Sequence, residues 1–411
     1  MESPEAKYLF DALTRDMNRL EGLSIDNMNS LVVDDGVMAE CIPSLSACTC
    51  MRKLNLSNLD LCTNSCSALS AVIPQMAALL ELDLSQNSID DDCIEFIARA
   101  LAKCGYLQKL DLGFNRISDD GLDVLVQRLP RSVRNLHLNS NRIGDDGLDA
   151  LVRGLPTNVR DLSLCNNRIG DDGLDTLVRG LPTNVRALSL SYNQVTLGRQ
   201  LSLLRFKEVR FSGNTLSPGG PQVIADSLAD PKCRLETLAL YGTSIGDEGM
   251  EILASSLRSN RRLTRMLFDH SHITERVWNA FSSILCDTAS INATYGSNHT
   301  LEKLGYYENV ARFDNAPRPA YVNTMLDLNS GEDKSRVAAN KILQTHRHLS
   351  MRPLFDKQFD LLPYVVAWLD RFAESDLKLS SIFEFARAMP MVIVEGVAVK
   401  KKAIKRRRSS S

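Results

Sequence analysis

Three residues in equivalent positions of consecutive segments carry the side-chain types of a hydrolase triad. Asp111, His137 and Ser163 each stand between two apolar leucines. A carboxylate, an imidazole and a hydroxyl can together activate a nucleophile. If the segments are neighbouring parallel strands, however, the three side chains all point the same way, and an open sheet provides neither an oxyanion hole nor a dry pocket. We therefore predict no catalytic residues and interpret the three as part of a polar binding surface.

Aromatic residues near the same segments are better candidates for function. Phe114, Tyr192 and Tyr241 follow the ends of the predicted strands, where the rim of a groove is expected. Exposed aromatic rings beside charged groups are typical energetic anchors of protein interfaces. The alternative is that these rings pack locally against adjacent turns. The predicted partner-binding residues are Asp83, Asp111, Phe114, His137, Tyr192, Arg210 and Tyr241.

Two cysteine pairs raise the question of a zinc site. Cys48 and Cys50 are separated by one residue, and Cys62 and Cys66 by three, which fits no common zinc module. The N-terminus lacks the basic and apolar regions of a secretory signal, so we expect buried thiols in a reducing compartment. There is also no glycine-rich phosphate loop, Walker motif or kinase signature. We expect no metal and no cofactor.

The last residues of the chain form a strongly basic tail that also contains a candidate phosphorylation site, Ser409, three residues after Arg406. A basic run of this size is typical of a segment recognised by a nuclear import receptor, and it also suits acidic membranes or nucleic acid. A solubilising end is the simpler alternative. A phosphate would add about −1.5 to −2 charges and weaken the cationic character. The basic side chains are Lys400, Lys401, Lys402, Lys405, Arg406, Arg407 and Arg408.

Composition places the chain among ordinary globular proteins. It has 411 residues, of which 44% are hydrophobic and 24% charged, so a disordered chain and a collagen-like or coiled-coil rod are disfavoured. The formal net charge of −2 combines an acidic body with the basic tail. The longest apolar run, residues 361–369, is far shorter than the ~20 residues that span a bilayer, so we predict no transmembrane segment.

An internal repeat must position all of these residues. Residues 141–164 and 167–190 differ at only two of twenty-four positions and share the frame L-x-x-L-x-L-x-x-N-x-I. The L-x-L alternation predicts a short strand with one buried face, and the Asn column should close the following turn by hydrogen bonds to backbone groups. The frame begins at Met51, Leu79, Leu107, Val133, Val159, Val185, Phe206, Leu235 and Leu263.

Each unit continues with a predicted helix. In one of them, Leu148, Leu151, Val152 and Leu155 form an apolar stripe, and the acidic pair at residues 145–146 should cap the N-terminus of the same helix. The unit from 185 to 206 has only 21 residues and lacks this segment, so we expect a turn there. Weaker copies of the frame occur at residues 20–25 and 293–298, and residues 326–328 form a candidate last strand.

Because one strand and one helix cannot bury their apolar faces alone, the units must stack. The frame resembles the leucine-rich repeat, and its helix-bearing units resemble the ribonuclease-inhibitor-like subtype. The resemblance implies an α/β solenoid in the form of a horseshoe, with a parallel sheet inside, helices outside and a helical C-terminal cap. We predict an N-terminal helix and capping repeat over 1–50, the solenoid over 51–300, the cap over 301–395 and a disordered basic tail over 396–411.

The main functional prediction is a non-enzymatic scaffold that binds a protein partner on the concave face, in the cytoplasm, the nucleus or both. The resemblance also offers an alternative, a regulator of a small GTPase similar to the Ran GTPase-activating protein. The tail is basic here, where that family typically has an acidic segment. A sensor resembling the NOD-like receptors has less support, because no nucleotide-binding domain precedes the repeats.

Overall fold

The computed structural model describes residues 19–25, 34–198, 203–269, 273–305 and 318–346, and within this part the chain forms two units. The first unit comprises residues 1–277 and 303–317, and the second comprises residues 278–302 and 318–411. The basic tail, its phosphorylation candidate and the predicted N-terminal helix lie outside the described residues. No helix among the described residues has the length and apolarity needed to cross a bilayer.

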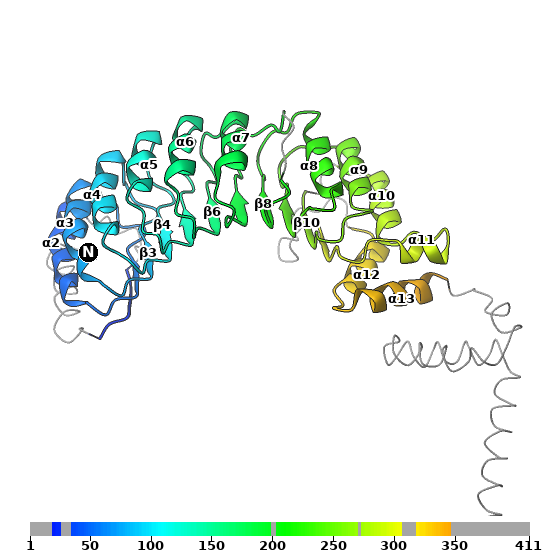
Figure 1. The fold of residues 1–411 in the computed structure, drawn as a ribbon, viewed down its shortest axis with the longest axis horizontal. Coiled ribbons are helices and arrows are strands. Elements are labelled where there is room, and N and C mark those ends of the chain that lie inside the picture. The colour runs from blue at the N-terminus through cyan, green and yellow to red at the C-terminus, as the bar shows by residue number, and fades with distance from the viewer. Residues whose placement is uncertain (1–18, 26–33, 199–202, 270–272, 306–317, 347–411) are drawn as a thin grey trace, which may run out of the picture. The chain divides into compact units, whose positions relative to one another are not determined.

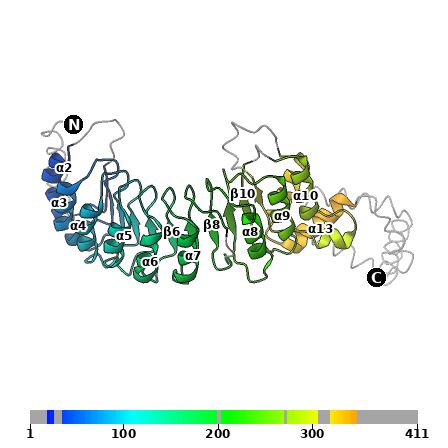
Figure 2. The ribbon, with the colours of Figure 1, turned by 90° about the horizontal axis from the view of Figure 1, so that it is seen from above.

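The first unit is built on a parallel sheet whose eleven strands follow one another in sequence order. Helices connect most of the consecutive strands and lie on the outer side of the sheet, and the repeats form a single row (Figures 1 and 2). This arrangement confirms the predicted leucine-rich repeat solenoid. The strands are β1 (Gly22–Ser24), β2 (Lys53–Asn55), β3 (Glu81–Asp83), β4 (Lys109–Asp111), β5 (Asn135–His137), β6 (Asp161–Ser163), β7 (Ala187–Ser189), β8 (Glu208–Arg210), β9 (Thr237–Ala239), β10 (Arg265–Leu267) and β11 (Lys303–Leu304).

Most of the helices on the outer side begin at an acidic or polar residue of the repeat, and two of them end at its glycine. Two short 3-10 helices, η1 (Ile42–Ala47) and η2 (Ile73–Gln75), each follow an α-helix in the first two repeats. The α-helices are α2 (Asp35–Cys41), α3 (Thr63–Val72), α4 (Asp91–Leu101), α5 (Asp119–Val126), α6 (Asp145–Gly154), α7 (Asp171–Gly180), α8 (Gly220–Ala229), α9 (Asp247–Ser256) and α10 (Glu275–Leu285).

The core lies between the sheet and the helices. The middle residue of each strand from β2 to β10 is at most 1% exposed, and it meets the apolar stripe of the helices. The Asn column closes the turns as predicted. The Asn167 amide nitrogen donates to the carbonyls of Leu138 and Leu164 at 3.0 and 3.1 Å, and its oxygen accepts from the Ile143 N–H at 3.1 Å. One side chain therefore joins two neighbouring repeats.

The first aspartate of the acidic pair that begins α5 and α6 acts differently from the prediction. The Asp145 carboxylate does not cap its own helix; it accepts a hydrogen bond of 2.7 Å from the N–H of Gly170, the N-cap residue of α7 in the next repeat. Asp119 bonds the N–H of Gly144 in the same way. The aspartates thus fasten each repeat to its successor. The physical reason is that the repeat brings a backbone N–H of the next turn within hydrogen-bond distance of each carboxylate.

The short repeat, residues 185–206, forms a turn as predicted. No helix occurs in the described part between β7 and β8, which is residues 190–198 and 203–207. Asp171 from the preceding repeat holds this turn by accepting from the N–H groups of Thr196 and Gly198, at 2.7 and 2.9 Å. The Arg205 guanidinium donates to the carbonyls of Leu181 and Leu177, at 2.7 and 3.1 Å, where α7 ends.

Two of the weaker strand predictions are wrong, and one is confirmed. Residues 22–24 form β1 as expected, but residues 291–295 form helix α11. The last strand instead starts at Lys303, because Asn298 caps the turn before it and accepts from the N–H groups of Thr300 and Leu301, both at 2.9 Å. Residues 326–328 lie within a helix. Two apolar residues separated by one other residue do not distinguish a strand from a helix.

The described part of the second unit is helical and contains α11 (Ile291–Tyr295), α12 (Ala320–Asn329) and α13 (Lys334–Thr345). Its most unusual residue is Lys341, whose side chain is fully buried. The ammonium group donates to the carbonyls of Leu285 and Asn298 at 2.6 and 3.0 Å. These backbone acceptors replace the water that the amine loses on folding.

Candidate functional site

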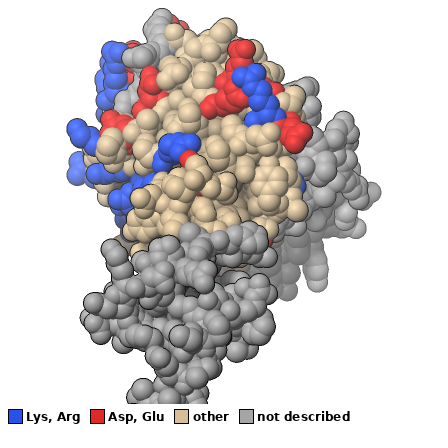
Figure 3. All heavy atoms as spheres, turned by 90° about the vertical axis from the view of Figure 1, so that its right-hand side faces the viewer, with Lys and Arg blue, Asp and Glu red and all other residues tan. Residues whose placement is uncertain are grey.

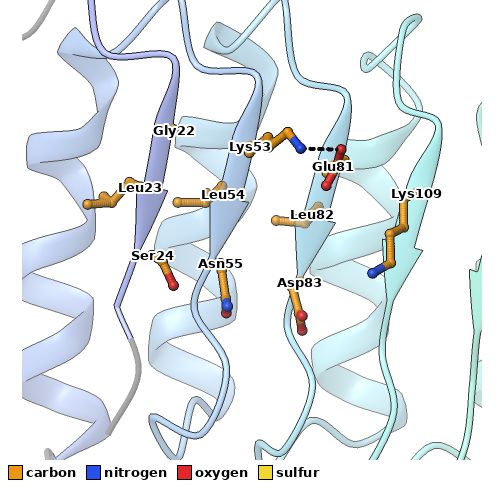
Figure 4. A pocket seen from close by; sticks show the side chains of 10 residues that line it. All are labelled: Gly22, Leu23, Ser24, Lys53, Leu54, Asn55, Glu81, Leu82, Asp83 and Lys109. Atoms are coloured by element: carbon orange, nitrogen blue, oxygen red, sulfur yellow. Dashed lines mark ion pairs between the residues drawn. The ribbon is translucent and has the colours of Figure 1, made fainter.

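The concave face of the first unit carries two columns of side chains, one on each side of the buried leucine column. Strand pairing places the predicted polar column in register, so that Asp111 lies beside His137 and His137 beside Ser163. Figure 4 shows Ser24, Asn55 and Asp83 in the same column near the N-terminal end. The column remains polar as far as Arg210, whereas Ala239 and Leu267 farther along are buried.

A second column, at the first position of each strand, was not anticipated from the sequence. It alternates in charge at its start, where the Lys53 ammonium lies 2.8 Å from the Glu81 carboxylate and Lys109 follows (Figure 4). These residues line a shallow pocket of about 370 Å³ at this end of the face. Period-two alternation places residues i and i+2 of a strand on one face, so the same pattern that gave the first column could have given this one. The column consists of Gly22, Lys53, Glu81, Lys109, Asn135, Asp161, Ala187, Glu208, Thr237, Arg265 and Lys303.

The centre of the concave face contains a close carboxylate–imidazole pair. The Asp111 Oδ2 atom lies 2.9 Å from Nδ1 of His137, and both side chains are partly buried. Burial acts to raise the pKa of the Asp111 carboxyl, but hydrogen bonds from His137 and the Gly113 N–H, with the charges of His137 and Lys109, hold it below its ordinary value. The pair thus fixes the orientation of the imidazole within the groove.

Ser163 is not connected to this pair. Its hydroxyl donates to Oδ1 of Asn139 at 2.5 Å, and the Cys165 N–H donates to the same oxygen at 3.1 Å. Asp161, in the neighbouring column, has a pKa raised by burial, although the charge of His137 acts against it. The arrangement is a cluster of hydrogen-bonding groups on an open floor, in which the Ser163 hydroxyl donates to Asn139 and not to a base that would activate it as a nucleophile.

Two of the predicted aromatic residues project from the rim beyond the ends of their strands. Phe114 is 58% exposed and Tyr192 is 63% exposed. Both have positive φ angles, of 54° and 56°. This left-handed conformation is unfavourable for bulky residues and is readily adopted by Gly and Asn. The equivalent turn positions of neighbouring repeats carry Asn58, Gln86, Ser140, Asn166, Gly213 and Gly242.

The ring of Tyr192 is held in place by the next repeat. A Cβ atom added to Gly213 would lie 2.3 Å from Tyr192 Cδ1, so the ring packs directly on the glycine backbone. Tyr241 differs from the other two aromatic residues because it is half-buried and its hydroxyl donates to the Gly305 carbonyl at 3.3 Å. For Tyr241, local packing accounts for at least part of the side chain's role.

The remaining predicted binding residues, Arg210 and Asp83, each have a partner two residues away in the sequence. Arg210 is exposed and pairs with Glu208 at 2.6 Å. The Asp83 carboxylate accepts from the N–H and hydroxyl of Ser85, at 3.0 and 2.6 Å. Over the surface drawn in Figure 3, basic and acidic side chains form small separate groups among uncharged ones.

The cysteines do not form a metal site in the part of the chain that is described. Within it, no group of three or more His, Cys, Asp or Glu residues could hold an ion. Cys48 and Cys66 are buried, Cys62 is half-buried and Cys50 is exposed. Burial raises the pKa of the Cys48 thiol, and the Cys66 pKa is raised by its hydrogen bond with Cys93 and by burial. Neither buried thiol is poised to act as a thiolate ligand.

The chain is similar to a known repeat family and to solved structures. A family model described as leucine-rich repeat matches residues 103–126, 130–152 and 156–178. Among solved structures, the chain is similar to an internalin from Listeria monocytogenes, with 19% sequence identity and a TM-score of 0.42, over 65% of this chain and 71% of that one. It is also similar to the leucine-rich repeat-containing protein LegL7 from Legionella pneumophila, with 17% identity and a TM-score of 0.43, over 76% and 90% of the two chains. The three matched segments contain the successive strands β4, β5 and β6, so the matched leucine-rich repeats lie side by side in the parallel sheet of the solenoid.

Proposed function

We propose that the protein is a scaffold that binds a protein partner on the concave face of its repeats, with Phe114 and Tyr192 as the anchors at the rim. The observation that carries this proposal is the presence of two exposed aromatic rings at positive φ, where neighbouring repeats have small or polar residues. Backbone strain of this kind is found preferentially at functional positions. Large exposed aromatic side chains supply much of the binding energy of protein interfaces.

The groove floor supports the same proposal. The Asp111–His137 pair in one column and the partly buried Asp161 in the other present hydrogen-bonding groups on the groove floor. Preorganised polar groups fix the orientation of a partner, while aromatic anchors supply affinity. Phe114 and Tyr192 lie three repeats apart, roughly 14 Å along the sheet at about 4.8 Å per strand. A partner that contacts both rings would cover this floor.

Affinity capture with the full-length chain tests the proposal. Phe114→Ala and Tyr192→Ala should each lose the same bound protein. Tyr295→Ala provides the matched control, because Tyr295 is 64% exposed and belongs to α11 of the second unit rather than to a repeat of the sheet. An unchanged set of captured proteins in the first two variants, or an equal loss in the control, would contradict the concave site.

The alternative function, regulation of a small GTPase, is supported by the sequence resemblance alone. Such a protein would act on a nucleotide held by its partner, so the test is stimulated GTP hydrolysis across a panel of small GTPases. No stimulation would remove this alternative and leave the scaffold proposal unaffected.

A separate role is proposed for the basic tail, whose seven positive charges fall within residues 400–408. We infer that it binds a nuclear import receptor and that phosphorylation of Ser409 weakens this binding, because the phosphate opposes the cationic charge. Residues 396–411 fused to a fluorescent reporter should accumulate in the nucleus. An even distribution through the cell would contradict the role in import.

A further inference from the structure

A row of basic side chains runs along the edge of the sheet opposite to the aromatic rim. Arg134, Arg160, Arg186 and Lys207 each immediately precede a strand, from β5 to β8. Backbone hydrogen bonds link them directly. The Arg160 N–H donates to the Arg134 carbonyl at 2.8 Å, the Arg186 N–H to the Arg160 carbonyl at 2.8 Å, and the Lys207 N–H to the Arg186 carbonyl at 2.7 Å. The four residues, which we call the basic ladder, therefore stand side by side at about 4.8 Å intervals.

The three arginines of the basic ladder have side chains available for a partner. All four ladder residues are exposed. Only Lys207 has an ion pair, with Glu236 at 2.5 Å, and within the described ranges no ion pair involves the guanidinium groups of the three arginines. Three adjacent guanidinium groups repel one another, and an anion placed along the row relieves this repulsion.

The surroundings of the basic ladder restrict the kind of anion that fits. On the groove side, Asp161 and Glu208 directly follow two of the ladder residues and line the concave face. A broad polyanion such as a nucleic acid would bring its phosphates against these carboxylates. At the N-terminal end of the ladder, Tyr106 is 68% exposed and lies two residues before Gln108, whose carbonyl accepts from the Arg134 N–H. The surface is therefore a narrow cationic row with an aromatic ring at one end.

We propose that the basic ladder binds an extended acidic segment of a partner protein. In an extended chain, side chains on one face repeat every ~6.6–6.8 Å, so carboxylates at alternate positions can reach three arginines whose own spacing is ~4.8 Å. Each guanidinium can bind a carboxylate through two parallel hydrogen bonds. This surface lies on the edge of the sheet where the strands begin, so it is separate from the rim that carries Phe114 and Tyr192, where the strands end.

The same repeats provide a matched control. Arg116, Arg142 and Arg168 form a second row of exposed arginines after the strands, with backbone hydrogen bonds of 2.8 Å to the preceding repeats. This row lies near the acidic pairs that begin α5, α6 and α7. Reversing two charges in either row changes the net charge equally, but the second row lies beside the acidic pairs that begin the helices.

Fluorescence polarisation with a fluorescein-labelled glutamate decapeptide tests the proposal on the full-length chain. Arg160→Glu with Arg186→Glu should weaken binding at least tenfold, whereas Arg142→Glu with Arg168→Glu should change it less than twofold. Arg160→Gln with Arg186→Gln removes the two positive charges without introducing carboxylates. This variant should show an intermediate loss of affinity for the decapeptide. Raising the ionic strength should weaken binding by the wild type, because screening reduces contacts between exposed charges.

Several results would overturn the proposal. These are no binding of the decapeptide by the wild type, an equal loss in both pairs of charge reversals, and tighter binding of a single-stranded oligothymidylate that depends on the same arginines. Loss of Phe114 or Tyr192 should leave the affinity for the decapeptide unchanged. The two surfaces can therefore succeed or fail independently.

Discussion

Replacing Phe114 and Tyr192 with asparagine should separate binding from folding. Asn58 and Asn166 occupy the same turn position with φ angles of 58° and 53°. A bulky residue in this conformation costs roughly 1–2 kcal/mol, while asparagine adopts it with a smaller penalty. Each substitution should therefore recover roughly 1 kcal/mol of backbone strain.

The lost packing offsets this gain. Phe114 is 58% and Tyr192 63% exposed, so each ring buries about two-fifths of its surface. For an aromatic side chain of about 200 Å², this is about 80 Å² of apolar burial, or at most about 2 kcal/mol at ~25 cal/mol per Å². The net loss is then about 1 kcal/mol per site, a minor change in the free energy of unfolding.

Binding should respond far more strongly. Truncation of an aromatic anchor costs about 2 kcal/mol or more, which raises Kd roughly 30-fold at each site. Titration calorimetry with the captured partner measures Kd, and urea unfolding of the same variants measures stability. A Kd within twofold of the wild type would refute the reasoning. A loss of several kcal/mol in unfolding would refute it as well, because the rings would then be structural.

Three further predictions concern the fold. Gly213→Ala should lower the free energy of unfolding by roughly 1–3 kcal/mol, because φ is +70° and the new Cβ would meet the Tyr192 ring. Gly246→Ala is the control, because the space around Gly246 is open. Equal urea midpoints for the two variants would contradict the prediction. Asn167→Ala should lower the free energy of unfolding, measured in urea, by about 3 kcal/mol or more, because three backbone carbonyls lose a donor and one N–H loses its acceptor. A loss below 1 kcal/mol would contradict the role of the Asn column in joining the repeats. Burial lowers the pKa of Lys341 to about 7 from 10.5, so the unfolded chain binds more protons between these values, and stability should rise with pH across this window by about 5 kcal/mol. Lys341→Met should abolish this rise in stability between pH 7 and 9, measured by urea unfolding at both pH values. The same rise in the variant as in the wild type would contradict the lowered pKa of Lys341.

The concave column could be predicted because the repeat fixes its register. Spacing alone placed Asp111, His137 and Ser163 on adjacent strands, and the pairing of β4, β5 and β6 agrees. The contact between Asp111 and His137 could not be predicted, because it depends on side-chain rotamers. Ser163 has an equally suitable partner in Asn139, and the sequence does not indicate which one it selects.

The errors have a common physical origin. In a periodic chain, a group such as the Asp145 carboxylate has equivalent backbone donors in its own repeat and in the next, and sequence spacing cannot tell them apart. The position of the last strand failed for a related reason. An inserted helix, α11, shifted the frame so that the strand follows Asn298. The positive φ angles of Phe114 and Tyr192 were also hidden, since the sequence shows residues that normally avoid this conformation.

Photo-crosslinking tests the central claim, binding of a protein partner at the concave rim, most directly. A photoreactive phenylalanine analogue would replace Phe114, Tyr192 or Tyr295 in the full-length chain, and adducts formed in cells would be identified by mass spectrometry. The first two positions should give adducts with the same protein, since both rings contact one partner along the same rim, and Tyr295 should give none with that protein. Adducts with unrelated proteins at the two rim positions, or the same adduct at Tyr295, would contradict the account.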